Sequence, residues 1–270
     1  MFTMNAKSIR AIPDDNLALP VSLTLKSGEF GSGFYLRGKR YIYLVTAKHV
    51  LFDLNTGALK GDYVEITSYQ KDPSNFSPSI FGIDIKTLHA NGKIKYKDRD
   101  IVAIVMGEYK HISKDENPII FFTEISSKAK NLEIVTAELA GLAKFEDVSI
   151  TGDVFISGYP KSIGIGHNQF DFERPLFRKG VVAGLNYQNK SIILDCIVYP
   201  GNSGGPVIQV DNFLDGSRKF SVIGIVIQLI PFSGSWINNQ FEYSKTSFTN
   251  SGYSVAESVD SVLALLGEDA

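Results

Sequence analysis

Residues 199–206 of this 270-residue chain are the most informative part of the sequence and read Tyr199-Pro200-Gly201-Asn202-Ser203-Gly204-Gly205-Pro206. The stretch holds one hydroxyl group between glycines, and glycine permits the unusual backbone angles and the close approach of substrate that a nucleophilic serine needs. The two flanking prolines stiffen the loop because their backbone angle φ is fixed. Ser203 is therefore the candidate nucleophile.

The position of the histidines restricts the kind of site that Ser203 could belong to. A serine between glycines also occurs in the nucleophile elbow of α/β-hydrolases, in which the catalytic histidine follows the serine along the chain. That order is excluded, because every histidine precedes Ser203: His49, His89, His111 and His167. His49 comes directly after an apolar, strand-like run that ends in Thr46-Ala47-Lys48, and a rigid strand end is a good mount for a general base.

A carboxylate that orients the imidazole would complete such a site. Asp100 opens the apolar run 100–106 and so stands immediately before a buried-looking strand. Asp98 lies on the same side of the strand-like alternation, and Arg99 could pair with either carboxylate. We prefer Asp100 as the third member and keep Asp98 as the alternative.

In the order His49, Asp100, Ser203, these segments resemble the trypsin-like serine protease family, and specifically its bacterial HtrA-type branch. Further short matches follow one another along the chain: Gly31-Ser32-Gly33-Phe34, Ile156-Ser157-Gly158-Tyr159-Pro160, the run 177–185, Ile223-Gly224-Ile225-Val226 and Gly252-Tyr253-Ser254-Val255-Ala256. The resemblance covers about residues 31–266. No room is left after Leu266 for the PDZ domain that HtrA-type proteases usually carry, so the expectation is a member of this branch without that domain.

The resemblance implies an all-β fold of two antiparallel six-stranded β-barrels with a catalytic cleft between them and a C-terminal α-helix. Many short strand-like segments separated by turns agree with this fold. Residues 1–118 would form the barrel half that carries His49 and Asp100, and residues 119–270 the half that carries Ser203, beginning with a strand in the run 132–138. Apolar residues at 259, 262, 263 and 266 recur at helical spacing after a candidate N-cap, Ser258.

The chemistry that the resemblance implies is peptide-bond hydrolysis through a Ser-His-Asp triad and an acyl-enzyme. Ser203 would attack the scissile carbonyl, His49 would transfer the proton, and Asp100 would fix the tautomer of His49. The backbone N–H groups of Gly201 and Ser203 would form the oxyanion hole. The expected protein is a cofactor-free serine endopeptidase acting on proteins or peptides. A catalytically silent or gated module of the same fold, which binds or senses a ligand, is the alternative.

Substrate preference follows from the positions that the resemblance assigns to the specificity pocket. Trypsin carries an acid six residues before its serine, whereas this chain has Ile197 there and Tyr199 nearer the mouth. The substrate-pairing strand would be residues 224–229, and Ile227, Gln228 and Leu229 would contact the substrate. Leu229 falls where an open pocket has glycine, so its bulk would shorten the pocket. We expect cleavage after small or medium aliphatic residues such as Ala, Val or Leu. The segment 231–251 is expected to overhang this region.

Asn202 stands where the digestive proteases carry an aspartate that pairs with a newly freed N-terminal ammonium. A neutral side chain needs no such partner, so we expect no N-terminal processing. Control would act through the order of the loop around Gly201, through residues 231–251, or through an activating partner that the sequence does not identify.

Composition restricts partners and compartment. The formal net charge of −2 and the pI of about 6.1 give no bulk attraction to nucleic acid or to an anionic membrane. The chain has no leader-like start and no apolar run long enough to span a membrane. The single cysteine, Cys196, cannot form an internal disulfide, which favours a cytoplasmic location. The remaining histidines have no second ligand at metal spacing, so no metal site is expected.

Overall fold

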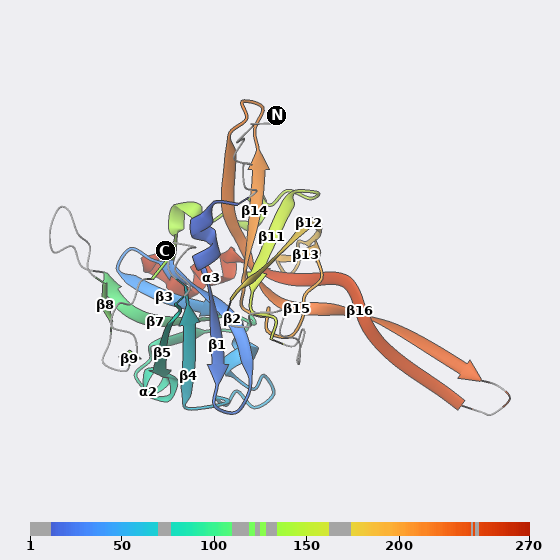
Figure 1. The fold of residues 1–270 in the computed structure, drawn as a ribbon, viewed down its shortest axis with the longest axis horizontal. Helices are drawn as coiled ribbons and strands as arrows, with labels where there is room; N and C mark the ends of the chain where they lie inside the picture. Colours follow the sequence, from blue (N-terminus) through green and yellow to red (C-terminus); the bar gives the residue numbers. More distant parts are fainter. Residues whose placement is uncertain are drawn as a thin grey trace, which may run out of the picture.

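The computed structural model describes residues 12–69, 77–109, 119–121, 125–127, 134–161, 174–238, 240 and 243–270. Two β-sheets dominate the fold, and the expected all-β organisation with a C-terminal helix is confirmed (Figure 1). The first sheet contains β1 (Pro20–Leu25), β2 (Phe30–Arg37), β3 (Tyr41–Thr46), β4 (Tyr63–Ser68), β5 (Ser79–Asp84), β6 (Ile94–Tyr96), β7 (Val102–Tyr109), β8 (Ile119–Phe121), β9 (Ile125–Ser127) and β10 (Thr136–Glu138).

The second sheet is a closed antiparallel barrel in the order β11-β12-β13-β16-β15-β14. Its strands are β11 (Asp153–Gly158), β12 (Leu176–Asn186), β13 (Ser191–Asp195), β14 (Pro206–Asn212), β15 (Arg218–Asn238) and β16 (Tyr243–Ser258). The α-helices of the described residues are α1 (Lys48–Leu51), α2 (Ile85–Ala90) and α3 (Val259–Leu266). The 3-10 turns are η1 (Asp14–Ala18), η2 (Leu139–Gly141), η3 (Phe145–Asp147) and η4 (Gly267–Asp269).

The first sheet differs in detail from the expected six-stranded barrel. Within the described residues it has ten strands, and its main path, β6-β7-β3-β2-β1-β4-β5-β9, is not closed. The segment expected to open the second barrel instead pairs in parallel with the first sheet, because β10 lies beside β2. Strands β8 and β9 also join the first sheet. The change of sheet therefore falls between Glu138 and Asp153 rather than at residue 118.

Strands β2 and β3 are buried on both faces, which explains their continuous apolar sequence. Successive side chains of a strand point to opposite faces. Tyr35, Ile42 and Leu44 enter the core of the first sheet. Phe34 and Val45 enter a second core that lies between the two sheets and also contains side chains of β14, β15 and α3. The two sheets therefore pack against each other through β2 and β3.

Helix α3 spans the expected residues, and its buried face packs in the core between the two sheets. Val259, Val262 and Leu266 are buried in the core between the sheets, which accounts for their helical spacing. Ser258 is the N-cap residue, although its hydroxyl donates to the carboxylate of Asp260 (3.4 Å) rather than accepting from the helix backbone. In the described part of the chain, no helix combines the length and the apolar character needed to cross a membrane.

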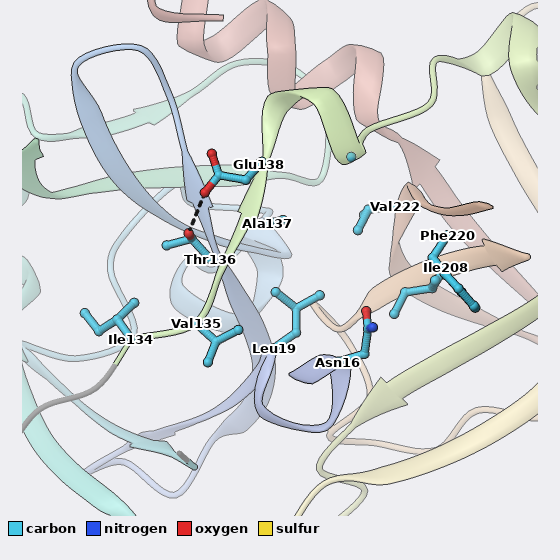
Figure 2. A pocket seen from close by; sticks show the side chains of 11 residues that line it. Asn16, Leu19, Ile134, Val135, Thr136, Ala137, Glu138, Ile208, Phe220 and Val222 are labelled. Carbon is cyan, nitrogen blue, oxygen red and sulfur yellow. Dashed lines mark hydrogen bonds between the residues drawn. The ribbon is translucent and has the colours of Figure 1, made fainter. Parts of the chain in front are cut away.

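A cavity of about 360 Å³ lies where the two halves meet, between η1, β10 and the strands β14 and β15 (Figure 2). Leu19, Val135 and Ala137 line it from the first half, and Phe220 and Val222 from the barrel. None of the expected site residues lines this cavity, so it is separate from the candidate site.

Candidate functional site

The pairing of β3 with β7 brings His49 and Asp100 together. Thr46, the last residue of β3, pairs with Val102, the first residue of β7. The residues that follow β3 and the residues that precede β7 therefore lie at the same end of the sheet. His49 lies in α1, three residues beyond the strand, rather than at the strand end itself. Its backbone N–H donates to Asp100 Oδ1 (2.9 Å), and its Nδ1 lies 2.7 Å from Asp100 Oδ2.

This two-point contact has a chemical consequence. A carboxylate that accepts from Nδ1–H leaves Nε2 of His49 as the unprotonated nitrogen, which is the arrangement a general base needs. Both side chains are partly exposed, the imidazole at 30% and the carboxylate at 21%. Asp100, and not Asp98, is therefore the carboxylate that contacts His49 in this structure.

Arg99 lies between the two aspartates in sequence but pairs with neither of the two. Its Nε donates to Glu257 Oε1 of the barrel at 2.7 Å, and Ser261 Oγ donates to the same oxygen at 2.6 Å. The Glu257 side chain is only 4% exposed, so an unpaired carboxylate there would be costly. The pair fixes the loop before β7 to the second sheet and leaves the Asp100 carboxylate to His49.

The loop that carries Ser203 depends on two glycines. Gly201 has φ +103° and Gly204 has φ +89°, a region that favours glycine. A Cβ atom at Gly201 would overlap the carbonyl oxygen of Tyr159, and one at Gly204 would overlap the carbonyl oxygen of Ser32. Any other residue at either position would therefore displace the loop.

Asn202 stabilises the same loop through hydrogen bonds to Tyr199 and Gly205. Its side chain is buried, at 2% exposure, and its Oδ1 accepts from the N–H of Tyr199 (3.0 Å). Its own N–H donates to the Tyr199 carbonyl (2.9 Å), and its carbonyl accepts from the N–H of Gly205 (2.9 Å). A neutral amide thus satisfies polar groups of the loop locally.

Ser32 of β2 holds the loop from the first sheet and is the residue that sequence reasoning missed. Its N–H donates to the carbonyl of Ser203 (2.8 Å), and its hydroxyl donates to the carbonyl of Gly201 (2.6 Å) and accepts from the N–H of Tyr159 (2.8 Å). The signal in the sequence was a serine between Gly31 and Gly33, at the start of an apolar strand-like run. Among the described residues, the N–H groups of Gly201 and Ser203 donate to no protein acceptor.

We expect Ser32→Ala to weaken the site without unfolding the protein. The substitution leaves the Gly201 carbonyl and the Tyr159 N–H buried without this partner, at a cost of about 1–3 kcal/mol each, and loosens the loop. The rate of Ser203 modification by a fluorophosphonate probe should fall roughly 10- to 100-fold, with the melting temperature lowered by about 4–20 °C. Ser32→Thr, which retains the hydroxyl, serves as the comparison. Equal rates for wild type and Ser32→Ala would refute this role.

The loop of Ser203 lies against the segment that leads into His49, because a Cβ atom at Gly204 would meet Thr46 and the backbone nitrogen of Ala47. Among the described contacts, no hydrogen bond joins Ser203 to His49. A Cβ atom built at Gly31 would lie 3.1 Å from the carbonyl oxygen of Ser203 and would also contact the side chain of Val50, which follows His49. Catalytic hydrogen bonds are often long in ligand-free enzymes and tighten when substrate binds. The loop of Ser203 and the segment that carries His49 therefore adjoin where the two sheets meet.

The expected substrate-binding residues lie on two segments that adjoin the nucleophile loop, one directly before it in sequence and one in β15. Ile197 is 37% exposed, and the guanidinium of Arg178 lies 4.9 Å from the ring centre of Tyr199. Ile227 packs on the core of the first sheet and Leu229 on that of the barrel, whereas Gln228 is exposed. Strand β15 is joined to the loop just before these residues, because Gly204 N–H donates to the Val226 carbonyl (2.7 Å) and Val226 N–H to the Gly205 carbonyl (3.0 Å).

Solved structures share this fold. The serine endoprotease from Yersinia pestis superposes with a TM-score of 0.50 at 13% sequence identity, over 96% of this chain and 66% of its own. Deg5 superposes with a TM-score of 0.51 at 16% identity, over 93% of this chain and 88% of its own. The chain thus spans just under two thirds of the length of the first of these proteins. A comparison with curated protein sequences found no match.

The family comparison is more specific than these structural likenesses. The model of the trypsin-like peptidase domain matches residues 31–216, well over half of the chain. The matched segment begins at the glycine that precedes Ser32 and includes His49, Asp100 and the whole loop around Ser203. The chain therefore belongs to the trypsin-like peptidase domain family.

Proposed function

We propose that this chain is a serine endopeptidase in which Ser203 is the nucleophile, His49 the general base and Asp100 the orienting carboxylate. The observation that carries the proposal is the two-point contact of Asp100 with His49, at 2.7 and 2.9 Å. The glycine-rich loop of Ser203 packs against Thr46 and Ala47, just before His49. Membership of the trypsin-like peptidase family supports a serine protease.

In this mechanism Ser203 Oγ attacks the scissile carbonyl while His49 Nε2 takes its proton. His49 then protonates the leaving amine, and a water molecule, activated by the same nitrogen, hydrolyses the acyl-enzyme. The free N–H groups of Gly201 and Ser203 are the proposed donors to the oxyanion, and each such donor is typically worth about 3 kcal/mol. The only cysteine does not compete as nucleophile, because burial raises the pKa of the Cys196 thiol to about 11.

The proposed substrate is a protein or peptide with a small or medium aliphatic residue before the scissile bond. The side chains proposed to line the pocket include Ile197, Ile227 and Leu229, and none of them is acidic. Digestion of a peptide library followed by mass spectrometry should therefore give cleavage after Ala, Val or Leu. Cleavage dominated by Lys or Arg at that position would contradict the proposed pocket.

A gated or silent module of the same fold is the second candidate, and the absence of a hydrogen bond between Ser203 and His49 is the observation that favours it. Reaction of the purified protein with a fluorophosphonate, with the modified peptide identified by mass spectrometry, separates the two. Modification at Ser203 supports a competent peptidase, and an unmodified Ser203 supports the gated module.

The proposal also includes a cytoplasmic location for the protein and control of its activity by an activating partner.

A further inference from the structure

Beyond the barrel, β15 and β16 continue as a two-stranded ribbon formed by residues 231–238 and 243–250, which we call the arm (Figure 1). The arm runs away from the body of the molecule instead of overhanging the site as the sequence suggested. Its large apolar side chains are exposed: Phe232 at 61%, Trp236 at 76%, Ile237 at 74% and Phe248 at 71%. A ribbon of two strands is marginally stable in water and gains stability when further strands join it, so this surface calls for a partner.

The two edges of the arm differ in charge. Along the arm, no described strand pairs with the outer side of β15 or with the outer side of β16. The β16 edge carries Lys245, and a lysine on an edge strand discourages pairing with another chain. The β15 edge has no charged residue between positions 227 and 238, and every residue after Pro231 keeps its backbone N–H. The edge of β15 is therefore the one that accepts a further strand.

The sequence of the β15 edge has the same chemical order in both directions. From either end toward its central glycine it runs apolar, aromatic, serine, in the stretch Pro231-Phe232-Ser233-Gly234-Ser235-Trp236-Ile237. Two identical strands that pair about a two-fold axis perpendicular to them are antiparallel, and each residue meets the residue at an equal distance on the other side of the axis. A strand that reads alike in both directions is therefore complementary to a second copy of itself.

We propose that the arm binds a second copy of this chain, with β15 of each copy pairing antiparallel about a two-fold axis that passes through Gly234. The product is a four-stranded sheet to which each copy supplies two strands. Phe232 then lies opposite Trp236 of the partner subunit, and the same pair forms a second time across the axis. Aromatic pairs are among the favourable cross-strand contacts of a sheet. Residues 224–229, which are proposed to contact substrate, lie outside the paired stretch.

The position of Gly234 fits such an axis. Phe232, Gly234 and Trp236 project from the same face of β15, because alternate residues of a strand do so. The ring of Phe232 extends toward Gly234, since a Cβ atom built there would lie 3.7 Å from Phe232 Cε1. Glycine weakens the interior of a strand and often marks the close approach of another backbone. An axis at Ser235 would instead place Trp236 opposite Gly234 and lose both aromatic pairs.

The exposed apolar area indicates a weak, reversible dimer. A buried aromatic side chain covers about 150–250 Å², so the exposed fractions of Phe232, Trp236 and Ile237 correspond to roughly 400 Å² in each arm. Together with the backbone of the two edges, pairing of two arms involves on the order of 1,000 Å², which is the size of transient interfaces. We therefore expect a dissociation constant on the order of 10 µM.

Sedimentation velocity at protein concentrations of about 1–300 µM tests the dimer. Wild type should pass from the 29.7 kDa of one chain to twice that mass. Ser235→Lys places one added charge on each side of the axis and should raise the dissociation constant about tenfold or more. Thr246→Lys is the matched control, because Thr246 pairs with Ser235 in the same arm but lies on β16. Its dissociation constant should stay within about threefold of wild type.

Two outcomes of this experiment would overturn the proposal. One is wild-type protein that stays monomeric over the whole concentration range. The other is a dimer, or a larger assembly, that Ser235→Lys leaves unchanged.

Single cysteines locate the axis. A residue on the two-fold axis faces its own copy with about 4.5–5.5 Å between the Cα atoms, which is within the range of a disulfide. Gly234→Cys should therefore form a covalent dimer under mild oxidation, and the native Cys196 is buried. Ser247→Cys is the control, because residue 247 pairs with Gly234 in the same arm but would lie three strand spacings of ~4.8 Å from its own copy. Cross-linking of Ser235→Cys in place of Gly234→Cys would overturn the pairing.

Trp236 provides a readout in solution. It is the only tryptophan of the chain, so its emission reports on the arm. The emission should shift to shorter wavelength over the concentrations at which sedimentation shows the dimer, and Ser235→Lys should suppress the shift. A shift caused by phosphatidylcholine vesicles while the protein stays monomeric would mean that lipid covers the arm, and would overturn the proposal. None of these measurements requires turnover, so they test the arm whether or not Ser203 is a nucleophile.

Discussion

Ser203→Ala is expected to abolish peptidase activity, with a fall in kcat on the order of a millionfold on the probe acetyl-Ala-Ala-Val coupled to aminomethylcoumarin. The substitution removes the proposed nucleophile, and His49→Ala should have a similar effect because the serine hydroxyl then loses its base. Hydrolysis above the uncatalysed rate by roughly 10³–10⁴-fold should remain from binding and from the N–H donors of the loop. Initial rates measured at high enzyme concentration check this expectation.

Two surface variants are matched controls for this loss. Ser149 and His89 are exposed and lie outside the proposed site, so Ser149→Ala and His89→Ala should retain wild-type rates. Circular dichroism and the melting temperature should show that all four variants are folded. Activity of Ser203→Ala above about one per cent of wild type would contradict the assignment of the nucleophile.

Asp100→Asn is expected to lower kcat by about 10⁴-fold while leaving the fold intact. The carboxylate accepts both the backbone N–H and the Nδ1–H of His49, and an amide can turn its NH₂ group toward Nδ1. The imidazole then carries its proton on Nε2, which is the wrong tautomer for accepting the proton of Ser203. Progress curves on the same probe, from pH 6 to 9, measure the loss.

Asp98→Asn is the matched control, because it changes the same group two residues away. Asp98 makes no contact with His49 in this structure, so its variant should keep most of the wild-type rate. If Asp98→Asn lost turnover and Asp100→Asn retained it, Asp98 rather than Asp100 would be the carboxylate that orients His49.

The sequence by itself determined the elements and residues whose signals are local. Gly201 and Gly204 have positive φ angles, which strongly favour glycine, so the loop around Ser203 can be recognised from its glycines. The buried face of α3 follows from the spacing of its apolar residues, because a helix repeats every 3.6 residues. His49 and Asp100 could be chosen because each adjoins a strongly apolar strand, and those strands turn out to be paired.

Only the tertiary structure decided which distant segments meet. Ser32 and Gly201 are 169 positions apart, and Arg99 and Glu257 are 158 apart, so no local pattern relates them. The parallel pairing of β10 with β2, which overturned the expected start of the second barrel, has the same origin. Strand periodicity indicates which face of a strand is buried, but its neighbour and its open edge depend on the packing of the complete sheets. For that reason the hold of Ser32 on the nucleophile loop and the free edge of the arm became visible only in the folded chain.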